Sequence, residues 1–116
     1  MGDLQIKVAC DKAIVALSEG DMDALSDIFD CMARMIFSVA YGITGNYHDA
    51  ENVLQETMIE ISKYAHKYRR GSNAKAWILT IARHCSIDIV RKRKPLVSIE
   101  ETMSIPYSEP DLTRIE

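Results

Sequence analysis

The sequence has 116 residues, of which 27% are charged and 47% hydrophobic, and its formal net charge is −3. This length predicts a single domain, which can bury enough surface to form a core without disulfides or a metal. The three cysteines match neither a secreted disulfide framework nor a metal-binding or redox pair, so a cytoplasmic protein is expected. The absence of a signal peptide and of any apolar run of about 18 residues argues against export and membrane insertion.

The small net charge hides a separation of charge along the chain. Residues 63–94 contain ten basic residues and one acidic residue, Asp88, for a net charge of +9, and the other residues together carry −12. A polyanion would therefore bind at one end of the molecule only. Nucleic acid is a candidate ligand for the basic segment.

Apolar side chains recur at helical spacing throughout, and no alternating stretch is long enough for a strand. A first helix is expected over residues 3–18, before Gly20. The second runs from a cap at Asp21 or Asp23 to a stop at Gly45. The expected buried stripe of the second helix is Leu25, Ile28, Phe29, Met32, Ile36, Val39, Ala40 and Ile43.

A third helix is expected to begin near residues 47–49, where early acidic residues suit a helix N-terminus. Its apolar face is Ala50, Val53, Leu54, Thr57, Met58, Ile61, Tyr64 and Ala65. Residues 68–73 interrupt the pattern, and there Gly71 frees the backbone while Ser72 or Asn73 can cap the next helix. The fourth helix covers residues 74–93, ends before Pro95, and buries Trp77, Ile78, Ile81, Ala82, Cys85 and Ile89.

These elements predict an all-α fold, a compact bundle of three to four helices over residues 1–94. Trp77 is expected to pack against Leu25, Phe29, Val53 and Ile61 or their neighbours. Residues 95–116 carry two further prolines and four net negative charges. We expect them to form an extended acidic linker or a disordered tail.

Four segments of the sequence resemble a known family. They read HDAENVLQETM at residues 48–58, YRRG at 68–71, AWILTIARH at 76–84 and DIVRKR at 88–93. In this order they resemble the N-terminal polymerase- and promoter-binding domain, sigma region 2, of extracytoplasmic-function (ECF) sigma factors, which carry DAEDxxQExF, FRG, WLxxIARN and DxxRRxR. The resemblance covers about residues 22–95. Met58 and Tyr68 stand where the family often has Phe, and His84 stands where it usually has Asn.

A polar strip lies along the third helix, opposite its apolar face. Its members Asp49, Asn52, Gln55 and Glu56 recur at positions i, i+3, i+6 and i+7, which share one side of a helix. In an anonymous sequence such a strip is most simply a solvated helix face. The resemblance implies instead that it docks on the clamp helices of core RNA polymerase. The expected polymerase-binding residues are Asp49, Glu51, Asn52, Gln55 and Glu56.

The basic segment combines cations, which bind phosphates, with aromatic rings, on which unstacked bases can lie. A core role for Trp77 and a solvated helix end at residues 91–94 are the simpler alternatives. The resemblance implies that this segment recognises and melts the −10 promoter element and reads a flipped non-template base, preferably in single-stranded DNA. The expected DNA-binding residues are Tyr64, Tyr68, Arg69, Arg70, Ser72, Asn73, Lys75, Arg83, His84, Arg91 and Arg93.

The sequence gives no sign of a metal site, a cofactor or an enzyme. No two His or Cys residues have the i, i+3 or i+4 spacing of metal ligands, and no catalytic constellation or phosphate-binding glycine loop is present. The alternative function is a protein-interaction bundle, a decoy or regulatory domain bound by an anti-sigma factor without DNA activity of its own. The retained basic loop and helix favour the transcription factor, for which an anti-sigma factor is also an expected partner. Family members carry a −35-binding domain after an acidic linker, so the sequence is either the first domain of a longer protein or a short stand-alone one.

Overall fold

The computed structural model describes residues 2–93, and every regular element in this range is a helix. The elements are α1 (Asp3–Ser18), α2 (Ala24–Thr44), α3 (Tyr47–Tyr64), the 3₁₀ helix η1 (Ala65–Lys67) and α4 (Ala74–Arg93). The predicted all-α bundle is therefore confirmed, and the helices begin and end within a few residues of their expected positions. The expected linker or tail at residues 95–116 lies outside the described residues.

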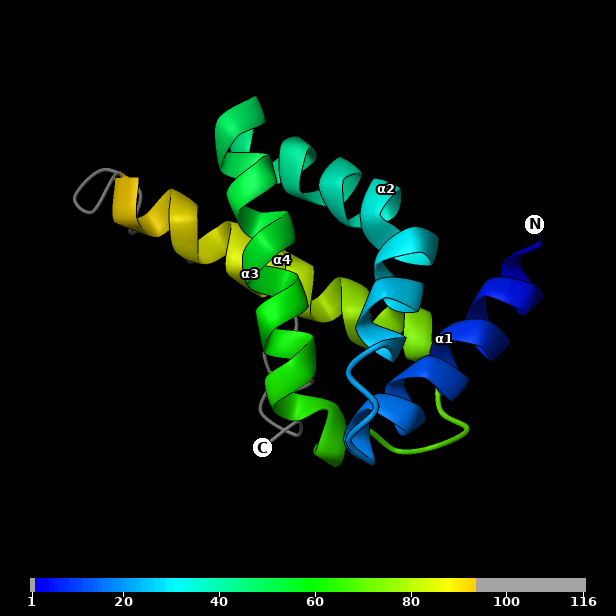
Figure 1. Ribbon diagram of the computed structural model, residues 1–116. Coiled ribbons are helices and arrows are strands. Elements are labelled where there is room, and N and C mark those ends of the chain that lie inside the picture. The colour runs from blue at the N-terminus through cyan, green and yellow to red at the C-terminus, as the bar shows by residue number, and fades with distance from the viewer. Residues whose placement is uncertain (1, 94–116) are drawn as a thin grey trace.

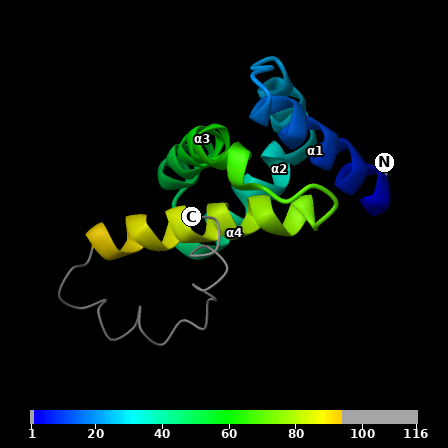
Figure 2. The same cartoon turned by 90° about the horizontal axis from the view of Figure 1, so that it is seen from below.

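Helix α2 is the central element, because each of the other three α-helices packs against it more extensively than against any other helix. Figure 1 shows α3 crossing in front of α4, with α1 at the opposite end of the bundle from the last turns of α4. Figure 2, seen from below, shows the segment between η1 and α4 running close to α1 before α4 begins. The fold thus places the segment at residues 68–73 beside α1, a contact partner of both η1 and α4.

Short polar residues and a left-handed glycine define the helix ends. Gly45 ends α2 with a φ of +67°, and its N–H donates to the Tyr41 carbonyl at 2.8 Å. Asn46 then caps α3, with Oδ1 accepting from the Asp49 N–H at 2.8 Å. The stop at Gly45 was predicted, whereas the cap at Asn46 was not. The sharp corner between α2 and α3 follows from these adjacent residues.

The beginnings of α2 and α4 differ in how they are capped. Asp23 precedes α2 but makes no side-chain capping bond, while Asp21 Oδ1 accepts from the Asp23 N–H at 3.1 Å. Asn73 caps α4, with Oδ1 accepting from the Ala76 N–H at 3.1 Å. The prediction of a cap at Ser72 or Asn73 is therefore confirmed for Asn73.

The main core is formed by aliphatic side chains from all four α-helices, each at most 1% exposed. It is centred on Ile14, Ile28, Met32, Ile36, Ile61, Ile78 and Ile81. A second, smaller cluster joins α2 to the first half of α3. It consists of Ala40, Ala50 and Val53, whose small size lets the two helices approach closely. Helix α4 contributes to both, because its half-buried Cys85 and Ile89 pack on the second cluster.

Phe29 departs from its expected burial, and other members of the expected apolar faces are only half-buried: Leu25, Val39, Ile43, Leu54, Met58, Tyr64, Trp77, Cys85 and Ile89. Phe29 is 43% exposed, because Ile28, Met32 and Ile36 already form the inward strip of α2 and Phe29 lies about 100° further around the helix. Trp77 is half-buried at the edge of the main core, where its ring meets Tyr68 edge-on with centroids 5.2 Å apart. Of its expected neighbours, Val53 belongs to the second cluster instead.

Candidate functional site

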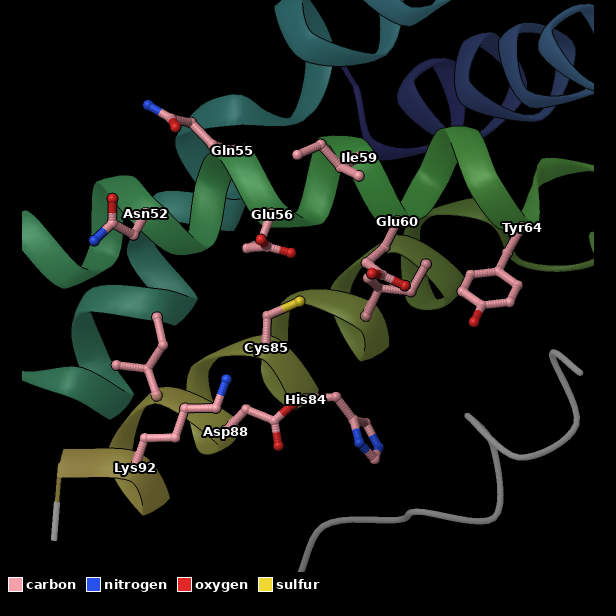
Figure 3. A pocket seen from close by; sticks show the side chains of 12 residues that line it. Asn52, Gln55, Glu56, Ile59, Glu60, Tyr64, His84, Cys85, Asp88 and Lys92 are labelled. Carbon is pink, nitrogen blue, oxygen red and sulfur yellow. The ribbon is translucent and has the colours of Figure 1, made fainter.

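A groove of about 510 Å³ lies between α3 and α4. Figure 3 shows the side chains of Glu56 and Glu60 reaching from α3 toward α4, with Cys85 below them. The groove is lined by Asn52, Gln55, Glu56, Ile59, Glu60 and Tyr64 from α3 and by Ile81, His84, Cys85, Asp88, Ile89 and Lys92 from α4. It therefore brings three of the expected polymerase-binding residues together with two of the expected DNA-binding residues, Tyr64 and His84.

The groove has an acidic character. Three carboxylates line it against a single lysine, Lys92. Burial is the main cause that raises the pKa of the Cys85 thiol to about 11; a contact with Thr57 opposes the rise, and the nearby charges of Glu60, Glu56 and Asp88 contribute to it. A thiol with this pKa remains protonated at neutral pH, so Cys85 serves as a packing residue rather than as a nucleophile.

Two expected site residues bind each other at the far end of α4. Arg93 Nη1 lies 2.8 Å from Asp49 Oδ2, and Arg93 Nη2 donates to the Thr44 carbonyl at 3.1 Å. The Asp49 side chain is only 17% exposed in this pair. Arg93 thereby connects the last turn of α4 with the corner between α2 and α3.

The expected polymerase-binding strip is divided among three environments. Asn52, Gln55 and Glu56 are exposed at the groove, whereas Asp49 is held in its ion pair. Glu51 lies on another side of α3, in a hollow that it shares with Phe29 and other residues of α2. The three residues at the groove form the part of the strip that is continuous in space.

The loop at residues 68–73 is attached to α1 by an aspartate. Asp11 Oδ1 accepts from the Tyr68 hydroxyl at 2.5 Å and from the Gly71 N–H at 2.8 Å. Burial, and then the hydrogen bond to Asp11, raise the pKa of Tyr68 to about 12. Within the loop, Ser72 Oγ donates to the Arg69 carbonyl at 2.7 Å. The loop is thus held by its own turn and by one side chain of another helix.

Asp3, the first residue of α1, and Glu19, the residue that follows α1, pair with cations of this region. Asp3 pairs with Lys75 at 2.5 Å, and this hydrogen bond and the charge of Lys75 lower the pKa of Asp3. Glu19 lies 4.0 Å from Arg70 in a pair that is largely exposed on both sides. Surface pairs of this kind contribute little to stability. They do place negative charge next to the expected DNA-binding loop.

The expected DNA-binding residues are spread along the whole of α4 and the preceding loop. Arg69, Arg70, Ser72 and Asn73 are exposed at one end, and Arg91 is exposed near the other. Arg83 is exposed between them. Lys75 and Arg93 are 18 residues apart, which corresponds to about 27 Å along a helix. The cations are therefore spread along α4 rather than gathered in one compact patch, and those at its two ends, Lys75 and Arg93, are paired with Asp3 and Asp49.

The sequence did not indicate several residues that shape these sites. Asp11 stands 57 positions before Tyr68 and 60 before Gly71, so no local pattern could connect them. Glu60, Asp88 and Lys92 line the groove, but in the sequence they look like ordinary charged positions on helices. Within residues 2–93, no group of three or more His, Cys, Asp or Glu side chains is placed to hold a metal ion. None of the described helices carries an apolar stretch long enough to cross a lipid bilayer.

Comparison with known proteins points to the same family as the four sequence segments. Residues 28–95 match the family described as sigma-70 region 2. The chain is 33% identical over 84 residues to the ECF RNA polymerase sigma factor SigW of Bacillus subtilis, covering 72% of this chain and 45% of SigW.

Two other ECF sigma factors are similar to the chain over part of their length. The chain is 30% identical to the ECF RNA polymerase sigma factor SigM of Bacillus subtilis, covering 68% of this chain and 48% of SigM. It is 34% identical over 61 residues to the ECF RNA polymerase sigma factor SigE of Mycolicibacterium smegmatis, covering 53% of this chain and 23% of SigE. The chain thus spans less than half the length of each of these relatives. It belongs to the sigma-70 region 2 family and carries the region 2 domain of an ECF sigma factor.

Proposed function

We propose that this domain binds core RNA polymerase and recognises and melts the −10 promoter element, reading a base of the non-template strand after it leaves the stack. Membership of the region 2 family and similarity to ECF RNA polymerase sigma factors support a role in transcription initiation. The observation that carries the DNA part of the proposal is the series of exposed arginines along the loop and α4, Arg69, Arg83 and Arg91. They are spaced over several turns, so they can meet more than one phosphate of a strand.

The polymerase contact is assigned to the groove side of α3. Asn52, Gln55 and Glu56 are exposed there, and the neighbouring Ile59 is 52% exposed. In such an interface Ile59 would supply an apolar centre, and the polar and acidic side chains around it would form the rim.

The DNA contact divides into two kinds of residue. Arg69 and Arg83 offer guanidinium groups for phosphates, which determine affinity for any sequence. Asn73 uses its Oδ1 to cap α4, so its amide NH₂ is the group left to donate to a base edge. We therefore expect Arg69 and Arg83 to control affinity and Asn73 to control sequence preference.

A binding titration tests the proposal. The probe is a fluorescent DNA strand of about ten nucleotides, selected by the chain from a random single-strand library, and it is compared by anisotropy with its scrambled sequence and its duplex. The parent should prefer the selected single strand, since the duplex adds an unstacking cost of a few kcal/mol. Arg69→Ala with Arg83→Ala should weaken binding to every strand and reduce the salt dependence, by about 0.7 in slope for each phosphate that is no longer neutralised.

Two controls separate specific recognition from a basic patch. Arg34→Ala removes an exposed arginine from α2 and should change neither the affinity for DNA nor the sequence preference. Asn73→Ser retains a capping hydroxyl and should reduce sequence preference without a comparable loss of affinity. If the parent binds selected and scrambled strands equally, the DNA function is wrong, and the alternative of a protein-interaction bundle bound by an anti-sigma factor takes its place.

A further inference from the structure

The carboxylate of Asp11 attaches the 68–73 loop to α1. It accepts two hydrogen bonds with the same oxygen, one from the Tyr68 side chain and one from the Gly71 backbone. Hydrogen bonds to an ionised carboxylate are shorter and stronger than those between neutral groups. Asp11 therefore fixes both ends of the turn that precedes the cap of α4.

The two donors are suited to fixing the loop in one conformation. Gly71 has a φ of +84°, a left-handed conformation in which its N–H points to Asp11 while the following Ser72 folds back on Arg69. The Tyr68 hydroxyl also lies 3.3 Å from the Ser72 carbonyl. A single carboxylate thus determines the geometry of the backbone just before Asn73.

The aromatic ring of Tyr68 extends this restraint to α4. Its hydroxyl is bound by Asp11, and its ring meets Trp77 edge-on at 5.2 Å. Trp77 lies in the first turns of α4, and its backbone N–H donates to the Asn73 carbonyl at 3.0 Å. Asp11, Tyr68 and Trp77 therefore form a continuous series of contacts from α1 to the residue that we expect to face a base.

We propose that Asp11 is a positioning residue, which preorganises the 68–73 loop so that Ser72 and Asn73 read a base in one geometry. This inference rests on the proposed DNA function and adds to it an element outside the four family-like segments. The carboxylate also places negative charge on the loop that carries Arg69 and Arg70. Asp11 therefore increases sequence preference while lowering affinity for phosphates in general.

Two substitutions separate these effects. Asp11→Asn keeps an oxygen that can accept both hydrogen bonds but removes the charge. Asp11→Ala removes both the acceptor and the charge. Asp30→Ala on α2 is the matched control, because it removes an exposed aspartate that makes no contact with the loop among the described residues.

The first measurement uses no DNA. The exchange rate of the Gly71 amide with solvent, measured by NMR on the full chain, should rise at least tenfold in Asp11→Ala and much less in Asp11→Asn, because this exposed N–H is protected by Asp11. The control should match the parent. Equal rates in the parent and Asp11→Ala would show that the carboxylate does not hold the loop, and would overturn the proposal.

The second measurement is the ratio of affinities for the selected strand and its scrambled sequence. In Asp11→Ala this ratio should fall about tenfold, the effect of losing a hydrogen bond to a charged group, while affinity for the scrambled strand stays equal or rises. In Asp11→Asn the ratio should be retained, with tighter binding to both strands. If Asp11 only stabilised the fold, Asp11→Ala would weaken binding to both strands by the same factor and leave the ratio unchanged.

The outcomes separate this inference from the function on which it rests. If the parent shows a sequence preference that survives in Asp11→Ala, the positioning role is wrong and the DNA function stands. If the parent shows no sequence preference, the DNA function is wrong and this inference is wrong with it, whatever the exchange rate of the Gly71 amide. Faster exchange at Gly71 with an unchanged ratio would also overturn the positioning role.

Discussion

Arg93, the last residue of α4, binds Asp49 in the first turn of α3 through a 2.8 Å ion pair and reaches the Thr44 carbonyl at 3.1 Å with its other terminal nitrogen. The guanidinium group therefore meets one residue on each side of the corner that joins α2 to α3. Because Asp49 also sits at a helix N-terminus, its charge is favoured there by the helix dipole. The pair links the second half of α4 to the small cluster of Ala40, Ala50 and Val53.

The first prediction concerns this pair. Arg93→Ala should lower the free energy of unfolding by about 1 kcal/mol, near the upper end for a partly exposed pair because the arginine binds in two places. Urea denaturation of Arg93→Ala, Asp49→Asn and the double variant forms a double-mutant cycle. Arg83→Ala is the control and should leave stability unchanged within about 0.5 kcal/mol. Additive losses across the cycle would show that the two residues do not stabilise each other.

The second prediction concerns the groove face of α3. Gln55→Ala combined with Glu56→Lys should strongly reduce binding of core RNA polymerase in a pull-down, because both side chains are exposed there and the second change reverses a charge. Helicity and thermal unfolding should be unaffected, since exposed substitutions usually shift stability by less than about 0.5 kcal/mol. Asp30→Lys on α2 makes a comparable charge reversal outside the groove and should bind normally. Normal binding by the double variant would remove the groove from the polymerase interface.

The third prediction concerns a buried hydroxyl. Thr57 is fully buried, and its Oγ1 makes no hydrogen bond with oxygen or nitrogen among the described residues, although it lies near the Cys85 thiol. Thr57→Val keeps the shape and should raise the free energy of unfolding by up to about 1 kcal/mol, because it removes a poorly satisfied polar group.

The comparison variant for this prediction is Thr57→Ser, which keeps the hydroxyl and removes the methyl group. It should lower stability by about 1 kcal/mol. Both variants can be measured by chemical denaturation. A loss of stability in Thr57→Val would mean that the hydroxyl has a favourable interaction with its surroundings.

The fourth prediction is a loss of stability at alkaline pH. Burial raises the pKa of the Cys10 thiol from 9.0 to about 11, with a further contribution from the neighbouring Cys31. Above pH 9 the unfolded chain releases this proton while the folded chain keeps it until about pH 11. The stabilisation is therefore complete below pH 9 and is lost as the pH rises toward 11, at most about 1.4 kcal/mol per pH unit for one thiol.

Urea denaturation at a series of pH values checks this dependence. Cys10→Ala should show a flatter decline above pH 9 than the parent, because one of the shifted groups has been removed. Cys85 and Tyr68 also have raised pKa values and will contribute the remaining slope in both proteins. Parallel curves for the parent and Cys10→Ala would contradict the assignment to Cys10.

Local features of the sequence were sufficient to predict the helices and the position of the break. Apolar spacing indicated the helical pattern, Gly45 marked the end of α2, and Asn73 was identified as a possible cap of α4. The polar residues at the groove, such as Gln55 and Glu56, were also expected to be exposed. These features depend on neighbours within a few positions, which the sequence shows directly.

Contacts between distant residues could not be predicted in this way. The pairing of Asp11 with Tyr68 and of Asp49 with Arg93 depends on how the helices cross, over separations of 57 and 44 residues. Phe29 was placed in the core because its helical spacing fits, but the spacing does not show which of two adjacent strips of α2 faces inward. The same reason explains why Trp77 lies at the edge of the core and not at its centre.

The position of Trp77 has a consequence for spectroscopy. It is the single tryptophan of the chain, and its ring packs on Tyr68 at the junction between the loop and α4. Movement of the loop changes the polarity around the Trp77 indole, and no other tryptophan contributes to the emission. The intrinsic emission of the native chain is therefore a label-free optical signal of whether the 68–73 loop is docked, readable in stopped-flow experiments at the moment a ligand arrives.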